Sequence, residues 1–318
     1  MKLEYQVIAA FGLDLLLGDP RWLPHPVRLI GRFALALESP LRRAIRNERA
    51  AGIAAVLLIL GVTATLTAAA VVAASRFHPI AGDVVSVFLM YTCFAARDLA
   101  AHSHRVYRAL KSGDLPEARR RVAMLVGRDT DRLDETGVTR AAVESVAENL
   151  VDGVTAPLFF AVLGGPVAAM LYKAASTLDS TFGYKTDRYL RFGWASARFD
   201  DLLNWVPARL TAPLVALTAM VFGLSPTGSW RACRRDARKH DSPNAGWPEA
   251  AVAGALGVQL GGVNYYDGEP HDGPRFGDPV RPLERHDIPR TNWLMLATAC
   301  VGLALFTGAR ALVGRVAL

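Results

Sequence analysis

Long apolar runs recur along the chain and dominate its pattern. The longest, residues 50–75, contains no charged residue. An α-helix needs roughly 20 apolar residues to cross the hydrocarbon core of a membrane, so this run is long enough to span it. Comparable runs predict membrane helices at 153–172, 210–230 and 291–309. A weaker run at 77–96 carries Asp83, which we expect near a membrane interface because charge at mid-bilayer is costly.

The composition supports this interpretation. Hydrophobic residues make up 52% of the 318 residues and aromatic residues only 8%, whereas soluble domains average about 45–50% apolar residues. Five buried helices of a soluble protein are the alternative, but buried helices are rarely so uniformly apolar. We therefore predict an all-α fold, a polytopic integral membrane helical bundle that forms a single domain over residues 1–318.

Basic residues predict the orientation of the bundle. A block of arginines precedes the first apolar run, and only Arg76 closely follows it. Because cytoplasmic flanks of membrane helices are enriched in Lys and Arg, we expect the N-terminus in the cytoplasm. Residues 97–149 then form a cytoplasmic helical region of a cell-membrane protein. Within it, Asp114 and Pro116 are expected to begin an amphipathic helix.

One apolar run does not fit a simple crossing. If 153–172 crossed fully, the basic segment 173–209 would lie outside the cell, against the charge rule. A Gly-Gly-Pro sequence at 164–166 interrupts this run, and interrupted runs can form broken or re-entrant helices that line a cavity. We predict a broken helix here. Residues 250–266 should form a helix inside the protein or a short sixth membrane element, and 267–290 a loop.

Several chemistries are excluded by the sequence. The three cysteines lie far apart and predict neither a disulfide nor a zinc site. No P-loop, dinucleotide-binding glycine motif, nucleophile elbow or zinc-protease helix occurs. The net charge of +7 lies in arginine-rich blocks without interleaved aromatic residues, so we expect no nucleic acid as a partner. The arginines in these blocks are expected to flank membrane helices on the cytoplasmic side, and phosphate binding is the alternative.

The first polar cluster interrupts the apolar N-terminus. Asp14 lies among leucines, where contact with lipid would be costly, so its side chain should face protein or water. Gly18-Asp19-Pro20 should end the first helix, and Pro24-His25-Pro26 should keep the chain extended. Together with Arg28, Asp19 and His25 are candidates for binding. An ordinary capping aspartate and a loop histidine are the alternative.

A second group of polar residues lies at 127–152. Glu144, Glu148 and Asp152 are four residues apart, so on a helix their carboxylates form one stripe in which like charges repel. A compensating cation is therefore expected. It is either Mg²⁺, which prefers oxygen ligands, or a basic side chain such as Arg140. The preceding segment with Arg128 is equally typical of a solvated charged surface.

Two further clusters lie in the second half of the chain. Asp200 and Asn204 share a helix face and could hold Mg²⁺ carried by phosphates, while an aspartate paired with Arg198 is the alternative. The same segment, 172–209, also contains Asp179, Lys185, Asp201 and Arg209. Residues 239–247 form a turn sequence beside a basic helix, and their polar side chains include His240, Ser242 and Asn244.

Carboxylates and arginines gathered beside nearly uncharged membrane runs are typical of Mg²⁺-dependent chemistry on phosphates. An ion-coupled transporter is the alternative, but its acidic residues would lie within the membrane runs. The pattern therefore favours an enzyme whose site faces the cytoplasm.

Taken together, the clusters resemble the CobD/CbiB family of membrane-bound cobalamin-biosynthesis proteins. Four segments carry the resemblance. Their opening residues are DLLLGDPRWLPHP from residue 14, GRDTDRLDE from 127, YKAASTLDSTFGYK from 172 and HDSPNAGWPE from 240. The resemblance runs in order from about residue 12 to 266. One departure is Ser176, where the family commonly has asparagine.

The resemblance implies an adenosylcobinamide-phosphate synthase, an ATP-dependent amide ligase. Such an enzyme joins the carboxylate of adenosylcobyric acid to the amine of an aminopropanol or ethanolamine phosphate. ATP serves as cosubstrate with Mg²⁺, and an acyl phosphate is the expected intermediate. A non-catalytic transporter or sensor distantly related to the family is the alternative, although such proteins would be expected to lack most of these motifs.

Site roles follow from the positions of these motifs. The expected catalytic residues are Glu144, Glu148, Asp152 and Asp201. The expected metal ligands are Glu148, Asp152, Asp200 and Asp201. The expected substrate-binding residues are Asp19, His25, Arg128, Asp179, Lys185, Asn204, Arg209, Ser242 and Asn244. If these residues form one pocket, Asp19 and His25 should lie near Glu148 and Asp201.

The expected partners are the corrinoid substrate, the aminoalcohol phosphate and the lipid bilayer. A homo-oligomer, or association with other membrane enzymes of cobalamin biosynthesis, is also expected.

Overall fold

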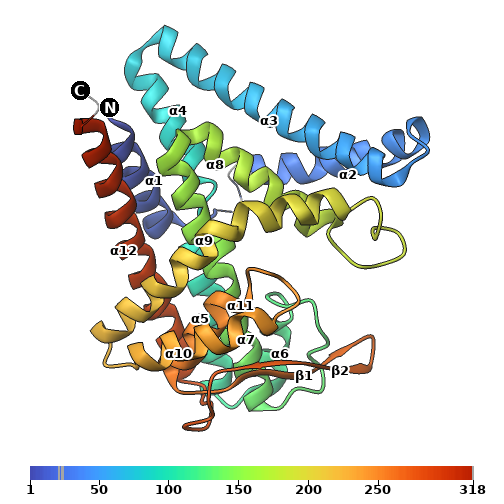
Figure 1. The fold of residues 1–318 in the computed structure, drawn as a ribbon, viewed down its shortest axis with the longest axis vertical. Coiled ribbons are helices and arrows are strands. Elements are labelled where there is room, and N and C mark those ends of the chain that lie inside the picture. Colours follow the sequence, from blue (N-terminus) through green and yellow to red (C-terminus); the bar gives the residue numbers. More distant parts are fainter. Residues whose placement is uncertain (21, 23–24, 317–318) are drawn as a thin grey trace. The chain divides into compact units, whose positions relative to one another are not determined.

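A computed structural model describes residues 1–20, 22 and 25–316 of the chain. Helices predominate in it, and Figure 1 shows their order. The chain divides into two compact units, each assembled from separated segments. The first contains residues 1–95, 156–204 and 303–318, and the second contains 96–155 and 205–302. The sequence was expected to form a single domain, and this division into units does not test that expectation, which stays a prediction.

The first unit is built from helices. Helix α1 (Leu3–Leu17) ends where Gly18 adopts a φ of 65°, and Asp14 on this helix is buried, as predicted. Pro26 begins the next helix, since its fixed φ suits the first helical position, whereas Pro24 lies outside the described residues. The other members are α2 (Pro26–Ala44), α3 (Glu48–Phe77), α4 (Pro79–Tyr91), α8 (Ala156–Phe182) and parts of α9 (Trp194–Val221) and α12 (Asp287–Val316).

Helix α8 is broken where the sequence predicts. Gly164 and Gly165 have non-helical dihedral angles, and Gly165 has a φ of 63°. Pro166 follows and lacks the backbone N–H that would continue the hydrogen-bond ladder. The first half of the helix therefore ends with unsatisfied carbonyl groups. The Nη1 group of Arg310 donates to the carbonyl oxygens of Val162 at 2.8 Å and Leu163 at 3.4 Å.

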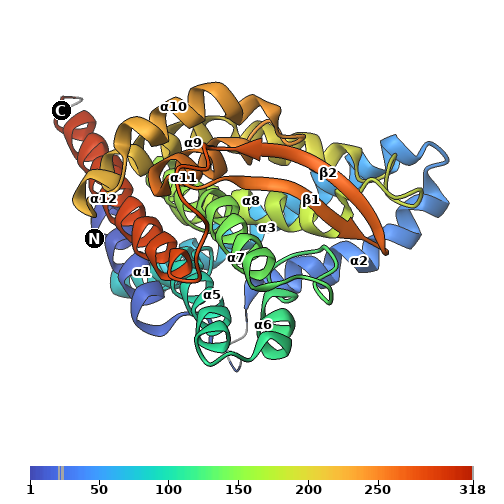
Figure 2. The same ribbon diagram turned by 90° about the horizontal axis from the view of Figure 1, so that it is seen from below.

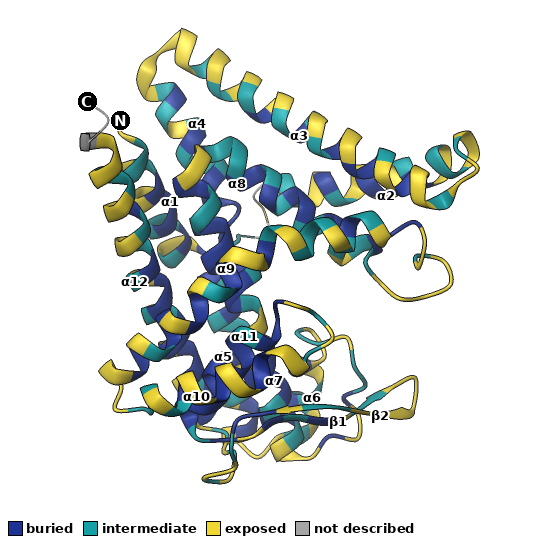
Figure 3. Cartoon of the chain, viewed as in Figure 1, coloured by how far each residue is buried: buried dark blue, intermediate teal, exposed yellow. Residues whose placement is uncertain are grey.

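Four stretches in the described part of the chain are long and apolar enough to cross a membrane. They are Glu48–Phe77, Pro79–Lys111, Glu135–Phe182 and Asp287–Gly314. The helix predicted at 210–230 is wrong as a single element. Helix α9 ends at Val221, Gly223 adopts a positive φ, and α10 begins at Pro226. Exposed residues follow the length of α3 (Figure 3), where apolar side chains such as Leu57 and Leu66 face outward.

The second unit contains the helical region predicted at 97–149. Its helix α6 begins as expected, because the Asp114 side chain accepts a hydrogen bond from the Glu117 nitrogen at 2.9 Å. The helices are α5 (Ala96–Lys111), α6 (Leu115–Val122), α7 (Glu135–Leu150), α10 (Pro226–Asp236) and α11 (Gly246–Leu256). Shorter turns are the π-helical η1 (Val151–Thr155) and the 3₁₀-helical η2 (Ala237–Lys239).

A β-hairpin follows α11 and corrects two predictions. Strand β1 (Leu260–Tyr266) pairs antiparallel with β2 (Glu269–Phe276). The helix predicted at 250–266 is therefore wrong beyond Leu256, and the loop predicted at 267–290 is wrong for β2. Asp267 and Gly268, both with positive φ, form the tight turn between the strands.

The hairpin lies beside α7 (Figure 2), and a glycine pair shapes its first strand. Gly261 and Gly262 have φ values of 81° and 94°, and the strand register is irregular between Gly261 and Val263. A Cβ atom on Gly261 would lie 1.9 Å from the Pro274 carbonyl oxygen. Only glycine fits both this backbone conformation and this close approach.

Helix α11 is buried along its whole length against α10 and other members of the second unit. The two helices touch through glycines, because a Cβ atom on Gly254 would lie 2.2 Å from the Gly228 carbonyl oxygen. This close contact fixes the position of Glu249, which lies in the first turn of α11.

Candidate functional site

A cavity of about 330 Å³ lies within the second unit. It is bordered by α7, the segment 125–128, the first turn of α11 and the hairpin. The acidic and basic side chains that line it are those of Arg128, Glu144, Glu148, His240 and Glu249. The cavity therefore brings together residues from the group at 127–152 and the group at 239–247.

Helix α7 supplies two of the carboxylates. The helix begins at Asp134, whose side chain accepts a hydrogen bond from the Gly137 nitrogen at 2.7 Å. Glu144 and Glu148 lie one turn apart, so both reach the cavity. Asp152 is not among the residues that line it, because it belongs to the π-helical turn η1, whose wider winding changes the angular spacing.

Glu144 is tied to its surroundings through both carboxylate oxygens. Its Oε2 accepts from Nη2 of Arg128 at 2.5 Å, and its Oε1 accepts from the Gly261 nitrogen at 2.6 Å. Arg140 lies one turn earlier on α7, with Nε 3.8 Å from Oε1. Pairing with arginine, the alternative considered for the acidic stripe, is thus present at Glu144.

The same arginines hold the hairpin. Arg140 donates to the carbonyl oxygens of Gly261 and Val263, and also to Oδ1 of Asn264 at 2.9 Å. Arg128 donates from Nη1 to this Oδ1 atom at 2.5 Å. The charged segment 127–135 is therefore a structural anchor for one wall of the cavity.

One donor of Arg128 remains unused. Its side chain is only 7% exposed, and its Nε–H forms no hydrogen bond with any described residue. A buried donor without a partner costs roughly 1–3 kcal/mol. Because Arg128 lines the cavity, this N–H is suited to an anionic oxygen of a ligand.

Glu148 differs from Glu144. Its side chain is exposed to the cavity, and none of the described residues donates a hydrogen bond to its carboxylate. A carboxylate that is open to a cavity can bind a cationic group of a ligand. Glu148 is therefore the acid of α7 that is placed to contact one.

Glu249 and His240 form an acid–base pair that also lines the cavity. His240 Nε2 lies 3.6 Å from Glu249 Oε1. His240 Nδ1 accepts a hydrogen bond from the Ser242 nitrogen at 2.8 Å, so a neutral imidazole carries its proton on Nε2, toward the glutamate. Burial raises the pKa of Glu249 well above 4.5, and the nearby Glu148 and Glu144 carboxylates raise it further.

The turn after His240 is held by its own side chains. Ser242 Oγ accepts from the backbone nitrogens of Asn244 and Ala245 at 3.2 and 3.3 Å. Asn244 Oδ1 accepts from Arg209 at 3.3 Å, and the Arg209 guanidinium stacks between the rings of Trp205 and Trp247, 4.2 and 4.9 Å from their centroids. These predicted binding residues form one group within the second unit.

The first unit contains the remaining predicted site residues in separate groups. Asp19 lies 3.3 Å from Arg28 Nη2 and 3.8 Å from His25 Nε2. Asn204 donates to Asp200 at 2.9 Å and accepts from the Tyr172 hydroxyl at 2.8 Å.

The carboxylates of Asp179 and Asp201 repel each other, and Lys185 and Arg198 attract Asp201. The expected proximity of Asp19 and His25 to Glu148 and Asp201 stays a prediction.

The carboxylate oxygens that line the cavity could hold Mg²⁺ only together with oxygen atoms from water or substrate. Within the described ranges, no three His, Cys, Asp or Glu side chains gather closely enough to hold one metal ion. Mg²⁺ typically takes one or two protein carboxylates and completes its shell with water and substrate phosphates. Glu148 and Glu249 fit that pattern, because both face the same cavity.

Glu249 and Asn264 are absent from the site predicted by sequence. Glu249 is the only charged residue in the stretch 246–266, and an isolated acid in a buried apolar helix is a recognisable signal. Asn264 gave no such signal, since its role depends on the unexpected hairpin.

Comparisons with known proteins find similarity to one protein family over nearly the whole chain. The family model described as CobD/Cbib protein matches residues 7–295. No solved structure matches the chain. A relative from Geobacter metallireducens named cobalamin biosynthesis protein CobD is 55% identical over 295 residues, covering 93% of each chain.

Other relatives extend this similarity. A protein of the same name from Leptospira interrogans is 47% identical and covers 90% of this chain and 91% of its own length. Cobalamin biosynthesis protein CbiB from Salmonella arizonae is 44% identical and covers 95% of each. The chain therefore belongs to the CobD/CbiB family of cobalamin-biosynthesis proteins.

Proposed function

We propose that the chain is the amide-forming ligase of cobalamin biosynthesis that makes adenosylcobinamide phosphate. It would join the carboxylate of adenosylcobyric acid to the amine of an aminopropanol or ethanolamine phosphate. Family membership supports the pathway. The observation that carries the site is the cavity in which Glu148, Glu249 and Arg128 come together.

The reaction sets two demands on the protein. A carboxylate is a poor acyl donor, so ATP first transfers its terminal phosphoryl group to the carboxylate, giving an acyl phosphate and ADP. The amine nitrogen then attacks the carbonyl carbon, the C–N bond forms, and the C–O bond to phosphate breaks. The protein must therefore hold phosphate groups and remove a proton from the ammonium form of the amine.

The cavity can meet both demands. Glu148 would hold the ammonium group through its cavity-facing carboxylate, and Glu249 would accept the proton that must leave before attack. The raised pKa of Glu249 makes its carboxylate a stronger proton acceptor than an ordinary glutamate. The Arg128 Nε–H would donate to an anionic oxygen of the phosphate or acyl group.

Glu144 has a different proposed role. Both of its oxygens are already bonded to Arg128 and Gly261. It would therefore hold the arginine and the hairpin in position rather than contact the substrate.

Mg²⁺ would be held by Glu148 or Glu249 together with ATP phosphates, and it would supply charge neutralisation for phosphoryl transfer. Asp152, Asp200 and Asp201 remain candidates for this role. Arg209 and Lys185 would bind phosphate groups. Asp19 and His25 would contact polar side chains of the substrate.

The size of the cavity limits what enters it. Cavities of roughly 300–1,000 Å³ suit ligands of drug size, and about 330 Å³ is at the lower limit. The corrin ring with its adenosyl ligand is far larger. The cavity would therefore receive the aminoalcohol phosphate and the reacting carboxylate arm, while the ring stays outside.

A direct assay tests this proposal. Membranes containing the protein are given adenosylcobyric acid, aminopropanol phosphate, ATP and Mg²⁺, and adenosylcobinamide phosphate is measured by mass spectrometry. Glu249→Gln keeps the shape of the side chain but removes the base, so we expect a rate loss of roughly 10²-fold or more. Glu269→Gln, at an exposed position on the hairpin that borders the cavity, is the matched control and should retain full activity.

The transporter alternative makes the opposite prediction. Vesicles containing the protein would accumulate the corrinoid, and adenosylcobyric acid would stimulate no ADP release. That outcome, with intact folded protein, would rule out the ligase.

A further inference from the structure

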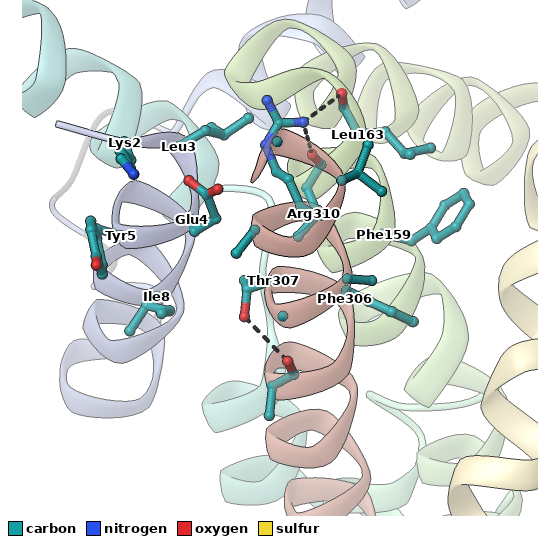
Figure 4. A pocket seen from close by; sticks show the side chains of 17 residues that line it. Lys2, Leu3, Glu4, Tyr5, Ile8, Phe159, Leu163, Phe306, Thr307 and Arg310 are labelled. Atoms are coloured by element: carbon teal, nitrogen blue, oxygen red, sulfur yellow. Dashed lines mark hydrogen bonds between the residues drawn. The ribbon is translucent and has the colours of Figure 1, made fainter. Parts of the chain in front are cut away.

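A second cavity lies entirely within the first unit and has a different chemistry. Its volume is about 910 Å³, and it is bordered by the start of α1, the end of the first half of α8 and the last turns of α12 (Figure 4). Its walls are mainly apolar. They include Leu3, Ile8, Phe159, Leu163, Phe306 and Val313.

The apolar walls continue onto an exposed apolar surface. Ile8 and Leu163 are about half exposed, and Val313 is 69% exposed. The part of α12 from Asp287 to Gly314 is long and apolar enough to cross a membrane, yet only 22% of its 18-residue apolar segment is buried. The cavity is therefore open toward the side from which membrane lipid would reach it.

Charged groups occur at one end of the cavity. Lys2, Glu4 and Arg310 are the charged residues among those that line it, which gives a net charge of +1. Figure 4 shows the three side chains grouped at the end of the cavity formed by the start of α1 and the last turns of α12. Arg310 uses Nη1 for the α8 carbonyls, and its Nη2 and Nε groups bond to none of the described residues.

We propose that this cavity binds an anionic phospholipid. The phosphate group lies between Lys2 and Arg310, and an acyl chain lies against the apolar walls. Net positive charge at one end selects an anionic head group, while the long apolar wall distinguishes a lipid from free phosphate. This site is independent of the ligase reaction, because none of its residues belongs to the catalytic cavity.

Native mass spectrometry of the purified full chain tests the proposal. The protein is titrated with phosphatidylglycerol and, separately, with phosphatidylcholine of the same acyl chains. We expect phosphatidylglycerol to bind more tightly. The exposed side chain of Lys2 forms no hydrogen bond or ion pair with the described residues, so Lys2→Gln should reduce that preference roughly fivefold without affecting folding.

A second variant fills the cavity. Gly308 lines it, and a Cβ atom there would meet nothing within 4 Å, so Gly308→Leu fits the helix and occupies the space. It should lower the binding of both lipids. Gly61→Leu on α3, also open within 4 Å and outside the cavity, is the matched control and should bind like the wild type.

Three results would overturn the proposal. The first is equal affinity of the wild type for the two lipids. The second is unchanged lipid binding by both Lys2→Gln and Gly308→Leu. The third is a change of oligomeric state in Gly308→Leu with lipid binding intact, which would assign the surface to a second copy of the chain.

Discussion

Glu144 on α7 accepts a hydrogen bond from the Gly261 backbone nitrogen on β1, at a distance of 2.6 Å. The second oxygen of the same carboxylate accepts from Arg128. One side chain thus connects a helix and the charged loop just before it to a hairpin that lies more than a hundred residues later in the sequence. The shape of the cavity depends on this connection.

We predict that Glu144→Gln lowers stability. The amide can still accept from Gly261, but Arg128 loses its buried counter-charge, which costs roughly 2 kcal/mol. Thermal unfolding in detergent and faster hydrogen exchange of β1 would measure the effect. Glu135→Gln, an exposed position in the first turn of the same helix, should change stability by less than about 1 kcal/mol. Equal effects of the two variants would contradict the anchoring role of Glu144.

Glu249 should make stability fall as pH rises. Its pKa in the folded protein lies well above 4.5, since burial and the Glu148 and Glu144 carboxylates disfavour ionisation. The native state then binds more protons than the unfolded state in the window above pH 4.5, so stability decreases through that window. Glu249→Gln should flatten the dependence and stabilise the protein at high pH. Unfolding midpoints of both proteins between pH 5 and 9 test this, and parallel curves would count against it.

Asp236 should make stability fall as pH is lowered, the opposite of the effect of Glu249. Burial alone would raise its pKa, but hydrogen bonds from Arg235, Lys239 and the Gly277 nitrogen outweigh burial and hold the pKa at about 2. A lowered pKa contributes stability above the unfolded value of about 4, and this contribution disappears as pH falls toward 2. Asp236→Asn should cost roughly 3 kcal/mol at neutral pH.

The measurement for Asp236 is chemical unfolding at pH 7 and pH 3. The difference between Asp236→Asn and the wild type should shrink at the lower pH. Asp278→Asn, an exposed partner of the same Arg235, is the control with a small expected effect. A difference that stays constant with pH would show that the charge of Asp236 contributes nothing.

Close packing of α10 on α11 predicts a steric effect at Gly254. Alanine there would bring Cβ within 2.2 Å of the Gly228 carbonyl oxygen, so the helices must separate. We expect a loss of roughly 1–3 kcal/mol and a weaker ligase activity, because α11 carries Glu249. Gly61→Ala, with open space around its Cβ, is the control and should be neutral or slightly stabilising. Normal unfolding of Gly254→Ala would argue against this packing.

Apolar periodicity and length were sufficient to predict the membrane-length helices, and the Gly-Gly-Pro sequence was sufficient to predict the break in α8. The helix start at Asp114 followed from local rules of capping. The expectation that the chain stays extended through Pro26 was wrong, because Pro26 is the first residue of α2. The error at 210–230 arose because composition did not reveal the turn at Gly223. The hairpin was missed because its strands contain five glycines and prolines and lack the alternation that marks a strand.

The site was predictable in its residue types and not in its geometry. Four-residue spacing correctly placed Glu144 and Glu148 on one side of a helix, but it extended the stripe to Asp152, where the π-helical turn interrupts it. Spacing also could not distinguish a paired carboxylate from an open one. That distinction depends on Arg128, Gly261 and the hairpin, which only the folded chain brings together.

The break in α8 also divides a macrodipole. Each half of the helix carries a partial negative charge of about half a unit at its carboxyl end and a matching positive charge at its amino end. The carbonyls of Val162 and Leu163 form the negative end, and the Arg310 guanidinium neutralises it. A chain shortened before residue 310 would leave this half-charge uncompensated, so the last turns of α12 act as a counter-ion for a helix nearly 150 residues earlier.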